Sequence, residues 1–453
     1  MLAPFRGIRY ARDRVSGIAN VTSPPYDVIN GGILDHLRAA DPHNVVRLIL
    51  PGEDAHASKA AASLLREWLS AGVLIRDRMA ALYIYEQSDA ASSWLQRGII
   101  GLVRLGSPES AGILPHEGVM PGLVAGRREL MAATQANLEP IFLIYDGEQA
   151  HDGDAADGGA VDGDAADTAT GVIDRVATER APLVTITTED GVTHRLWRLG
   201  DPAEQCAIAA DLAGRRALIA DGHHRYAAYM DLQAEMRASG QGAGPWDYGL
   251  AFLVDSAAYP PRLGAIHRVL PGLAPDRAAE LAKAAFTVED LPADLSLDDA
   301  LQRLAAAGRE ATAFLLAGGP VFRLLSHPDP VQVAASMPAG VSAPWRTLDA
   351  SIMQQLLLGR LWGVTDSEHD VLIDHDAADA VRAVSGDATA TDVAECPVGA
   401  ASASGGTAVI SNPVSFEAVI QIAAHGERVP RKSTSFGPKP RTGLVLRTFG
   451  PSD

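Results

Sequence analysis

In the middle of this chain the sequence predicts an apolar strand that runs directly into a tight polar turn and then a helix, a junction that requires a fold with both strands and helices. Residues 217–220 read Ala-Leu-Ile-Ala, and Asp-Gly-His-His-Arg follows at 221–225. Gly222 permits a sharp reversal, and residues 226–236 have the composition of a helix. A strand that turns straight into a helix is typical of proteins in which helices pack on sheets.

The same junction suits a bound anion. The first N–H groups of a helix lack partners within it, and the helix dipole adds partial positive charge there. Arg225, His223 and His224 stand beside these groups, so the turn could hold a phosphate. Asp221 could cap the helix, hold a metal ion or accept a substrate proton. A capped helix with surface histidines remains the alternative.

Hydrophobic periodicity predicts the other elements. Strands are expected at 44–50, 81–86, 98–104, 183–187, 194–199, 249–255 and 406–410. Helices are expected at 59–71, 202–212, 276–285, 297–307, 348–361 and 413–424. This order of elements predicts a fold between α/β and α+β, with mixed sheets and packed helices.

The length of 453 residues exceeds one ordinary core, so several regions are expected. They are an N-terminal α/β region at 1–146, an acidic disordered insertion and linker at 147–180, a central region at 181–330 and a C-terminal region at 331–453. The insertion contains Asp-Gly-Asp-Ala-Ala-Asp twice, at 152–157 and 162–167, and has no apolar period. A calcium loop is the alternative, although the bidentate Glu that such loops use is missing.

Charge and composition exclude several classes of protein. The net charge of -18 argues against nucleic acid as a partner, because DNA binders need a basic face. Two cysteines are too few for a disulfide scaffold or a structural zinc site. No run of eighteen apolar residues and no signal sequence occur, so we expect a cytoplasmic protein that does not enter the membrane.

Three further segments contain residues suited to chemistry. His116 and Glu117 lie in a loop rich in Gly and Pro, where acid–base residues are often placed. Tyr26 and Asp27 follow two prolines in a stiff turn and could face a pocket. The densest basic stretch of the chain contributes Lys432, Ser433, Thr434 and Lys439, a mixture that binds phosphate. Each segment could instead be a solvated loop or a rigid turn.

The usual nucleotide and hydrolase motifs are missing from the sequence. It contains no G-x-x-x-x-G-K-[ST], no G-x-G-x-x-G after a first strand, no H-E-x-x-H and no G-x-S-x-G. If the protein handles nucleotides, it does so without these loops.

Taken in order, the motifs resemble the family catalogued as domain of unknown function 1015. The resemblance rests on residues 24–29, 41–48, 116–117, 137–142, 220–226, 348–349 and 431–439. It spans nearly the whole chain and leaves out the acidic insertion. Gly437 stands where the family pattern leads us to expect an aromatic residue.

The Asp-Gly-His-His-Arg turn also resembles the Gly-x-x-Arg turn of the ParB/sulfiredoxin superfamily, which implies a core of that type around the strand, turn and helix. The superfamily includes free-serine kinases, sulfiredoxins and nucleotide-dependent partition proteins. Sulfiredoxins need a cysteine in the turn, where this chain has Gly222, His223 and His224. Partition proteins need a basic DNA-binding region. The resemblance therefore favours a small-molecule kinase, with free L-serine as the leading acceptor.

This resemblance implies roles for the candidate residues. Gly222, His223, His224 and Arg225 would cradle the phosphates of ATP or ADP, and Asp221 would hold Mg²⁺ or orient the hydroxyl. Glu117 would be the base, with Asp27 as the second candidate. Tyr26, Asp27 and His116 would contact the substrate. The phosphates would also be bound by Lys432, Ser433, Thr434 and Lys439.

Two other functions stay open at this point. One is a nucleotide-binding regulatory protein that transfers no phosphoryl group. The other is a metal-dependent hydrolase that uses His223 and His224. The expected partners are a nucleotide and a small-molecule substrate, and a homodimer is left open.

Overall fold

The structure, a computed structural model, describes residues 2–52, 54, 56–106, 112–148, 168–365, 370–385 and 405–450. The chain divides into two compact units. Unit 1 comprises Met1–Pro115, Val119–Pro261 and Pro438–Asp453, and unit 2 comprises His116–Gly118 and Arg262–Gly437. This division differs from the regions expected at 181–330 and 331–453. The end of the chain returns to unit 1 because β21 (Arg447–Thr448) pairs with β7 (Ala136–Asn137).

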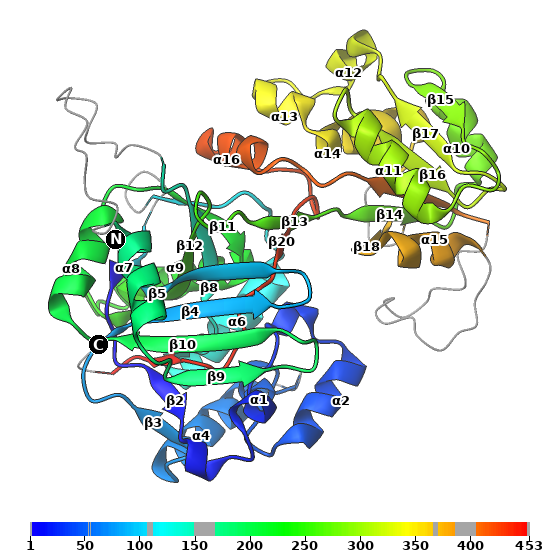
Figure 1. Cartoon of the computed structure of the whole chain (residues 1–453). Coiled ribbons are helices and arrows are strands. Elements are labelled where there is room, and N and C mark those ends of the chain that lie inside the picture. Colours follow the sequence, from blue (N-terminus) through cyan, green and yellow to red (C-terminus); the bar gives the residue numbers. More distant parts are fainter. Residues whose placement is uncertain are drawn as a thin grey trace, which may run out of the picture. The chain divides into compact units, whose positions relative to one another are not determined.

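Unit 1 is built on one large mixed sheet (Figure 1). Its strands lie in the order β6 (Ile113–Leu114), β11 (Ala217–Asp221), β8 (Ile141–Tyr145), β12 (Tyr248–Asp255), β5 (Trp94–Arg104), β4 (Leu82–Asp89), β10 (Thr193–Leu199) and β9 (Val184–Thr187), and β1 (Leu2–Ala3) also pairs with β5. The pairs β11–β6 and β12–β8 are parallel, and the others are antiparallel. The expected fold class, mixed sheets with packed helices, is confirmed.

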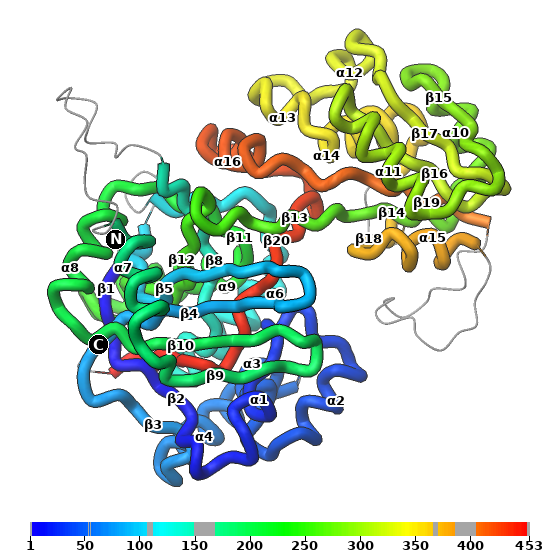
Figure 2. The backbone as a smooth tube through the Cα atoms, viewed as in Figure 1, coloured from blue at the N-terminus to red at the C-terminus, as the bar shows by residue number. Residues whose placement is uncertain are grey.

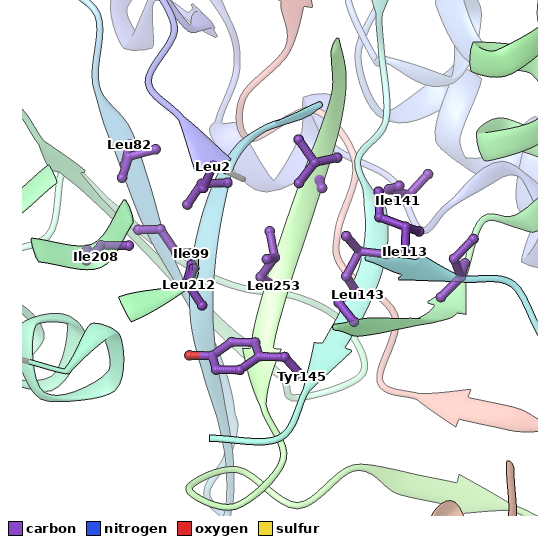
Figure 3. Packing of buried hydrophobic residues seen from close by; sticks show 14 of the residues in the cluster. Leu2, Leu82, Ile99, Ile113, Ile141, Leu143, Tyr145, Ile208, Leu212 and Leu253 are labelled. Carbon is purple, nitrogen blue, oxygen red and sulfur yellow. The ribbon is translucent and has the colours of Figure 1, made fainter. Parts of the chain in front are cut away.

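Helices cover one face of this sheet. They are α6 (Pro121–Thr134), α7 (Ala169–Glu179), α8 (Pro202–Asp211) and α9 (His223–Ala238). Alternate residues of β8, namely Ile141, Leu143 and Tyr145, point to this side, as the two-residue period of a strand requires. Figure 3 shows Ile208 and Leu212, at the end of α8, among the strand side chains. The alternation of buried residues thus places the main core of unit 1 between sheet and helices.

A second core in unit 1 corrects one expected strand. Residues 44–50 form no strand, because Val46–Ile49 is the short helix α3. Asn44 accepts a hydrogen bond from the Val46 N–H at 2.9 Å and donates one to the Asn20 carbonyl at 2.8 Å. A continuous apolar run fits a buried helical turn as well as a buried strand, so periodicity could not separate them. Around α3 lie β2 (Ile8–Tyr10), α1 (Ile18–Val21), η2 (Tyr26–Val28), α2 (Gly31–Ala40), α4 (Ala57–Ser70) and β3 (Leu74–Arg76).

The linker expected up to residue 180 is also corrected. Ala169–Glu179 is helix α7, and Thr168 caps it by accepting a hydrogen bond from the Gly171 N–H at 3.0 Å. Val172 and Val176 are buried against the sheet, so the linker prediction was wrong from residue 169 onward. The acidic repeats at 152–157 and 162–167, and with them the calcium-loop alternative, lie outside the described residues.

One carboxylate holds both ends of the insertion. Asp255 accepts hydrogen bonds from the Gly147 N–H at 3.0 Å and from the Thr170 hydroxyl at 2.7 Å. A Cβ on Gly147 would lie 2.2 Å from an oxygen of Asp255, so this position requires glycine. Because the two ends already meet at Asp255, the residues between them are not needed to bridge a distance.

We therefore expect a short Gly-Ser linker in place of residues 149–167 to leave the unfolding temperature within about 2 °C of the parent value, since loop-closure entropy depends weakly on length. Asp255→Ala should lower the unfolding temperature, because the part-buried Gly147 N–H, Thr170 hydroxyl and Ala257 N–H all lose their acceptor. Differential scanning calorimetry of both variants checks this. A large destabilisation by the linker alone would show that the insertion itself contributes to the fold.

Unit 2 has a separate antiparallel sheet with helices on both faces (Figure 2). The strand order is β15 (Thr287–Asp290), β17 (Arg323–Ser326), β16 (Phe314–Ala317), β19 (Thr407–Ser411), β14 (His267–Leu270) and β18 (Leu372–Asp374). Phe314 and Leu316 face α10 (Pro275–Ala282), α14 (Asp349–Ile352) and the π-helix η6 (Met353–Trp362), whereas Leu315 and Ala317 face α11 (Leu297–Gly308) and α15 (Ala377–Ser385). The other elements are α12 (Pro330–Ser336), α13 (Ala343–Thr347), α16 (Phe416–Ala424), β13 (Arg262–Gly264) and β20 (Ser435–Gly437). Of the described helices, none is both long and apolar enough to cross a bilayer.

A buried histidine in unit 1 makes stability depend on pH. The His194 ring contacts the Tyr85 hydroxyl at 2.8 Å and the Thr188 hydroxyl at 3.1 Å. Burial, followed by the charge of Arg441, lowers the pKa of His194 to about 4. The unfolded chain has a histidine pKa of about 6.5, so it binds more protons than the folded chain between these values.

We expect the free energy of unfolding to fall by up to about 3 kcal/mol through His194 as the pH drops from 6.5 to 4. His194→Gln removes the titrating group and should flatten this part of the pH dependence. Urea unfolding at pH 7 and at pH 4.5 measures the difference between the two chains. Equal losses of stability in both would contradict the assignment to His194.

Candidate functional site

The side chain of Asp221, the last residue of β11, departs from the regular alternation of the strand. The register of β11 on β8 shifts between Ile219 and Asp221, and such a bulge re-aims the residue that follows it. Gly222 then adopts a φ of +94°, and α9 begins at His223. A Cβ on Gly222 would lie 3.1 Å from both Arg225 Nε and a methyl of Ile141, so glycine is needed for conformation and for space. No side chain caps α9, which leaves Asp221 available for other contacts.

Asp221 is the centre of a cluster of charged side chains in unit 1. It forms ion pairs with Arg225, one helical turn onward, and with Lys439 Nζ at 2.7 Å. Lys439 Nζ also pairs with Asp27. Asp27 comes from η2, Asp221 from β11 and Lys439 from the C-terminal segment, so the fold unites three predicted residues from distant parts of the sequence. We call Asp27, Asp221, Arg225 and Lys439 the Asp–Lys cluster.

Burial is uneven across the Asp–Lys cluster. The exposed fraction of the side chain is 8% for Asp221, 24% for Lys439 and 33% for Asp27. Burial raises the pKa of Asp221, but the charges of Arg225 and Lys439 outweigh it, so its pKa lies below the usual value. Burial lowers the pKa of Lys439, and Asp221 and Asp27 more than compensate, so its pKa is raised. Asp221 is therefore ionised, Lys439 is charged, and Asp27 offers the most accessible carboxylate.

A buried glutamate that was given no role from the sequence holds two sides of this cluster. Glu139 accepts hydrogen bonds from the Tyr26 N–H at 3.0 Å and from the Thr442 hydroxyl at 3.3 Å. Tyr26 directly precedes Asp27, and Thr442 lies close after Lys439, so Glu139 ties the segments of both charges together. Burial raises the pKa of Glu139, while Arg225 and then Arg127 act in the opposite direction. Its only signal in the sequence was the motif at 137–142, which supported the resemblance without a function.

Tyr26 lies between two guanidinium groups. The Cζ atom of Arg127 is 4.2 Å from the centre of the Tyr26 ring, and that of Arg225 is 5.9 Å away. Burial raises the pKa of Tyr26 to about 12 although the charge of Arg225 acts in the opposite direction, so the phenol is neutral near pH 7. These cation–π contacts stiffen the turn that presents Asp27.

The two histidines of the turn have different surroundings. His223 is buried, with 7% of its surface exposed. His224 Nε2 accepts a hydrogen bond from the Met120 N–H at 3.1 Å, which fixes the start of α6 against α9. Within the described ranges, no group of three or more His, Cys, Asp or Glu side chains is arranged to hold a metal ion.

The other predicted site residues lie in unit 2. His116 is fully buried, its Nε2 contacts the Thr434 hydroxyl at 2.9 Å, and its carbonyl accepts from the Val429 N–H at 2.9 Å. The Ser433 hydroxyl donates to the Pro430 carbonyl at 2.6 Å. Glu117 follows His116 and is half-buried. Lys432 is exposed and has a φ of +53°, a left-handed conformation that is uncommon outside glycine. The structure thus brings the predicted residues together in two sets, one in each unit.

A family model with the description "Protein of unknown function (DUF1015)" matches residues 2–156 and 159–351 of this chain. The match includes the Pro-rich turn, the His-Glu loop and the Asp-Gly-His-His-Arg turn, and it covers more than half of the sequence. No curated protein matches the chain.

Several solved structures share similarity with the chain. A free serine kinase variant in complex with ADP is 12% identical, with a TM-score of 0.35, over 75% of this chain and 87% of that one. SbnI with a C-terminal truncation, from Staphylococcus aureus, is 11% identical, with a TM-score of 0.33, over 77% and 87%. A conserved hypothetical protein from Pyrococcus furiosus is 11% identical, with a TM-score of 0.32, over 75% and 90%.

Proposed function

The chain belongs to the DUF1015 family of proteins of unknown function, and we propose that it is a nucleotide-dependent kinase that phosphorylates the hydroxyl of a small molecule. The observation that carries this proposal is the Asp–Lys cluster at the N-terminus of α9. Phosphoryl transfer needs fixed positive charge at the phosphates, carboxylates for a metal ion and a base for the acceptor. Asp27, Asp221, Arg225 and Lys439 supply such groups.

The phosphates of ATP or ADP would lie at the first turn of α9. The N–H groups of this turn and the helix dipole favour an anion. Arg225 Nε is buried and has no hydrogen-bond partner among the described residues. It lies beside Gly222, where the absence of a side chain leaves room for the guanidinium itself. The other nitrogens of Arg225 bond to the Pro140 carbonyl and to Asp221, so the guanidinium is already fixed in position.

The carboxylates fit Mg²⁺. Oxygens of Asp27 and Asp221 contact the same Lys439 ammonium, so both already point at one cation. Mg²⁺ prefers oxygen ligands and is usually held by one or two carboxylates together with phosphates and water. The two carboxylates and two cations of the cluster cancel in formal charge, which leaves the phosphate charge of a nucleotide to be neutralised by other groups. When bound, Mg²⁺ would supply that neutralisation.

The transfer itself requires two actions from the chain. Asp27, the most exposed carboxylate of the cluster, accepts the proton of the acceptor hydroxyl. The hydroxyl oxygen then bonds to the terminal phosphorus, the phosphoanhydride bond breaks, and the nucleotide leaves with the electron pair. Lys439 and the first turn of α9 stabilise the charge that develops on the phosphate oxygens. Glu117, the first base candidate from the sequence, lies in unit 2 and stays a prediction.

The choice of acceptor rests on the turn rather than on the cluster. The resemblance of residues 221–225 to the turn of free-serine kinases favours free L-serine. A serine hydroxyl carries no charge, so a carboxylate base such as Asp27 suits it.

The proposal is tested by incubating the protein with Mg²⁺, ATP or ADP, and a pool of free amino acids and small alcohols. Mass spectrometry should detect one acceptor that gains a phosphoryl group, with phosphoserine expected. Nucleotide hydrolysis without any phosphorylated acceptor would overturn the kinase assignment and favour a nucleotide-driven regulatory protein. A chain that neither binds nor consumes nucleotide would overturn the phosphate site as well.

A further inference from the structure

The turn Lys432–Thr434 in unit 2 is held from behind by a buried arginine. Arg268, in β14, has only 2% of its surface exposed. One of its nitrogens donates hydrogen bonds to the carbonyl oxygens of Arg431, at 3.0 Å, and of Lys432, at 2.9 Å. Two consecutive carbonyls therefore face the same guanidinium.

Peptide geometry then dictates where the N–H groups of the turn point. In a trans peptide the C=O and N–H bonds point in opposite directions. The carbonyl of Arg431 shares its peptide plane with the Lys432 N–H, and the carbonyl of Lys432 shares its plane with the Ser433 N–H. Both N–H groups are therefore directed away from Arg268, and neither has a backbone acceptor among the described residues.

Consecutive N–H groups on one side of a left-handed residue form a concavity that binds anions. Lys432 is that residue, with a φ of +53°, and such a conformation is retained only when the surroundings enforce it. Arg268 enforces it from one side. The next peptide is fixed at both ends, because the Thr434 hydroxyl contacts His116 and the Ser433 hydroxyl donates to the Pro430 carbonyl.

We propose that Arg268 is a positioning residue that holds Lys432–Thr434 as a binding turn for a phosphate group, so that unit 2 has an anion site of its own. The Lys432 and Ser433 N–H groups and the Lys432 ammonium contact the anion, and Arg268 shapes the backbone from behind. The proposal rests on the proposed function only for the identity of the ligand, which would be a nucleotide phosphate or a phosphorylated product.

Two substitutions at the exposed Lys432 separate charge from backbone shape. Lys432→Gly and Lys432→Val both remove the ammonium. Glycine adopts positive φ without cost, whereas a β-branched residue does not, so only Lys432→Val should disturb the turn. Calorimetric titrations of the full-length chain with inorganic phosphate, ADP and phosphoserine, each used separately, measure the effect. Relative to the parent, we expect Lys432→Gly to weaken binding of the preferred probe about fivefold and Lys432→Val to weaken it about tenfold further.

A variant at Arg268 tests the positioning role itself. Arg268→Gln should weaken the same probe as strongly as Lys432→Val. Arg309→Gln, at an exposed arginine of unit 2, is the matched control and should leave binding unchanged. Thermal unfolding of each variant shows whether unit 2 remains folded, and the Lys432 pair tests the turn even if Arg268→Gln does not fold.

The outcomes distinguish this proposal from the kinase assignment. Equal affinities of Lys432→Gly and Lys432→Val would overturn the preorganised turn, whatever the activity of the protein. If the two variants differ clearly in affinity but the protein phosphorylates no acceptor, the anion-binding turn is supported and only the kinase assignment is overturned. The probe that loses most affinity identifies the source of the phosphate group.

Discussion

Replacing Asp221 by Asn is expected to lower the rate of phosphoryl transfer by about a thousandfold while the nucleotide still binds. Asp221 contacts Lys439 and Arg225 at once, and its neutral analogue holds neither cation with a full charge. The amide also offers a poorer ligand for Mg²⁺ than a carboxylate does. The rate is measured by following the phosphorylated acceptor by mass spectrometry at saturating nucleotide.

A second carboxylate in unit 1 provides the matched control. Asp211 pairs with Arg215 four residues onward, at 2.9 Å, as Asp221 pairs with Arg225, but it does so at the end of α8. Asp211→Asn should therefore cost some stability and leave the transfer rate within about twofold. A comparable loss of rate in both variants would mean that Asp221 acts through the fold rather than through the reaction.

Replacing Arg225 by Met is expected to destabilise unit 1 by about 3–5 kcal/mol and to abolish nucleotide binding. Removing one partner of a buried ion pair leaves the other charge buried without compensation. Arg225 is 4% exposed, and it bonds to Asp221 and to the Pro140 carbonyl. Chemical denaturation gives the loss of stability, and nucleotide titration below the unfolding transition gives the loss of binding.

The double variant Asp221→Asn with Arg225→Met separates the two effects. Because it removes both charges, it should recover part of the stability that Arg225→Met loses. Nucleotide binding should stay absent, since the guanidinium beside Gly222 is still missing. Full nucleotide binding by a folded Arg225→Met chain would remove Arg225 from the phosphate site and leave it a purely structural residue.

Several elements of the structure could be predicted because their causes are local. The hairpin of β9 and β10 follows from two alternating runs separated by a turn with glycine, and β11 and α9 follow from a change of period at Gly222. Gly222 was recognised for the conformation that it adopts, since a φ of +94° is a property of the residue itself.

The errors occurred where burial, rather than period, decides the conformation. Residues 45–50 are apolar except for Arg47, so the same run fits a strand or the buried helix α3. The start of α7 lies directly after an acidic segment without apolar period, and its composition masked a helix that is stabilised by packing on the sheet.

The motifs of the candidate site could also be selected from the sequence, but their grouping could not. Lys432–Thr434 and Lys439 form one basic stretch in the sequence, and the structure places them in different units. Glu139 could not be assigned from the sequence, because a lone glutamate in an apolar motif gives no sign that it will accept hydrogen bonds from Tyr26 and Thr442.

The sequence by itself therefore determined many of the longer strands and helices and the position of the sharp turn, because backbone conformation is largely a local property. Only the tertiary structure decided that Asp27 meets Lys439, 412 residues away. That contact depends on the C-terminal segment pairing back onto unit 1, through the bridge of Ser23 with Thr442 and the strands β21 and β7. Such long-range pairing is set by the packing free energy of the whole unit, which no local pattern records.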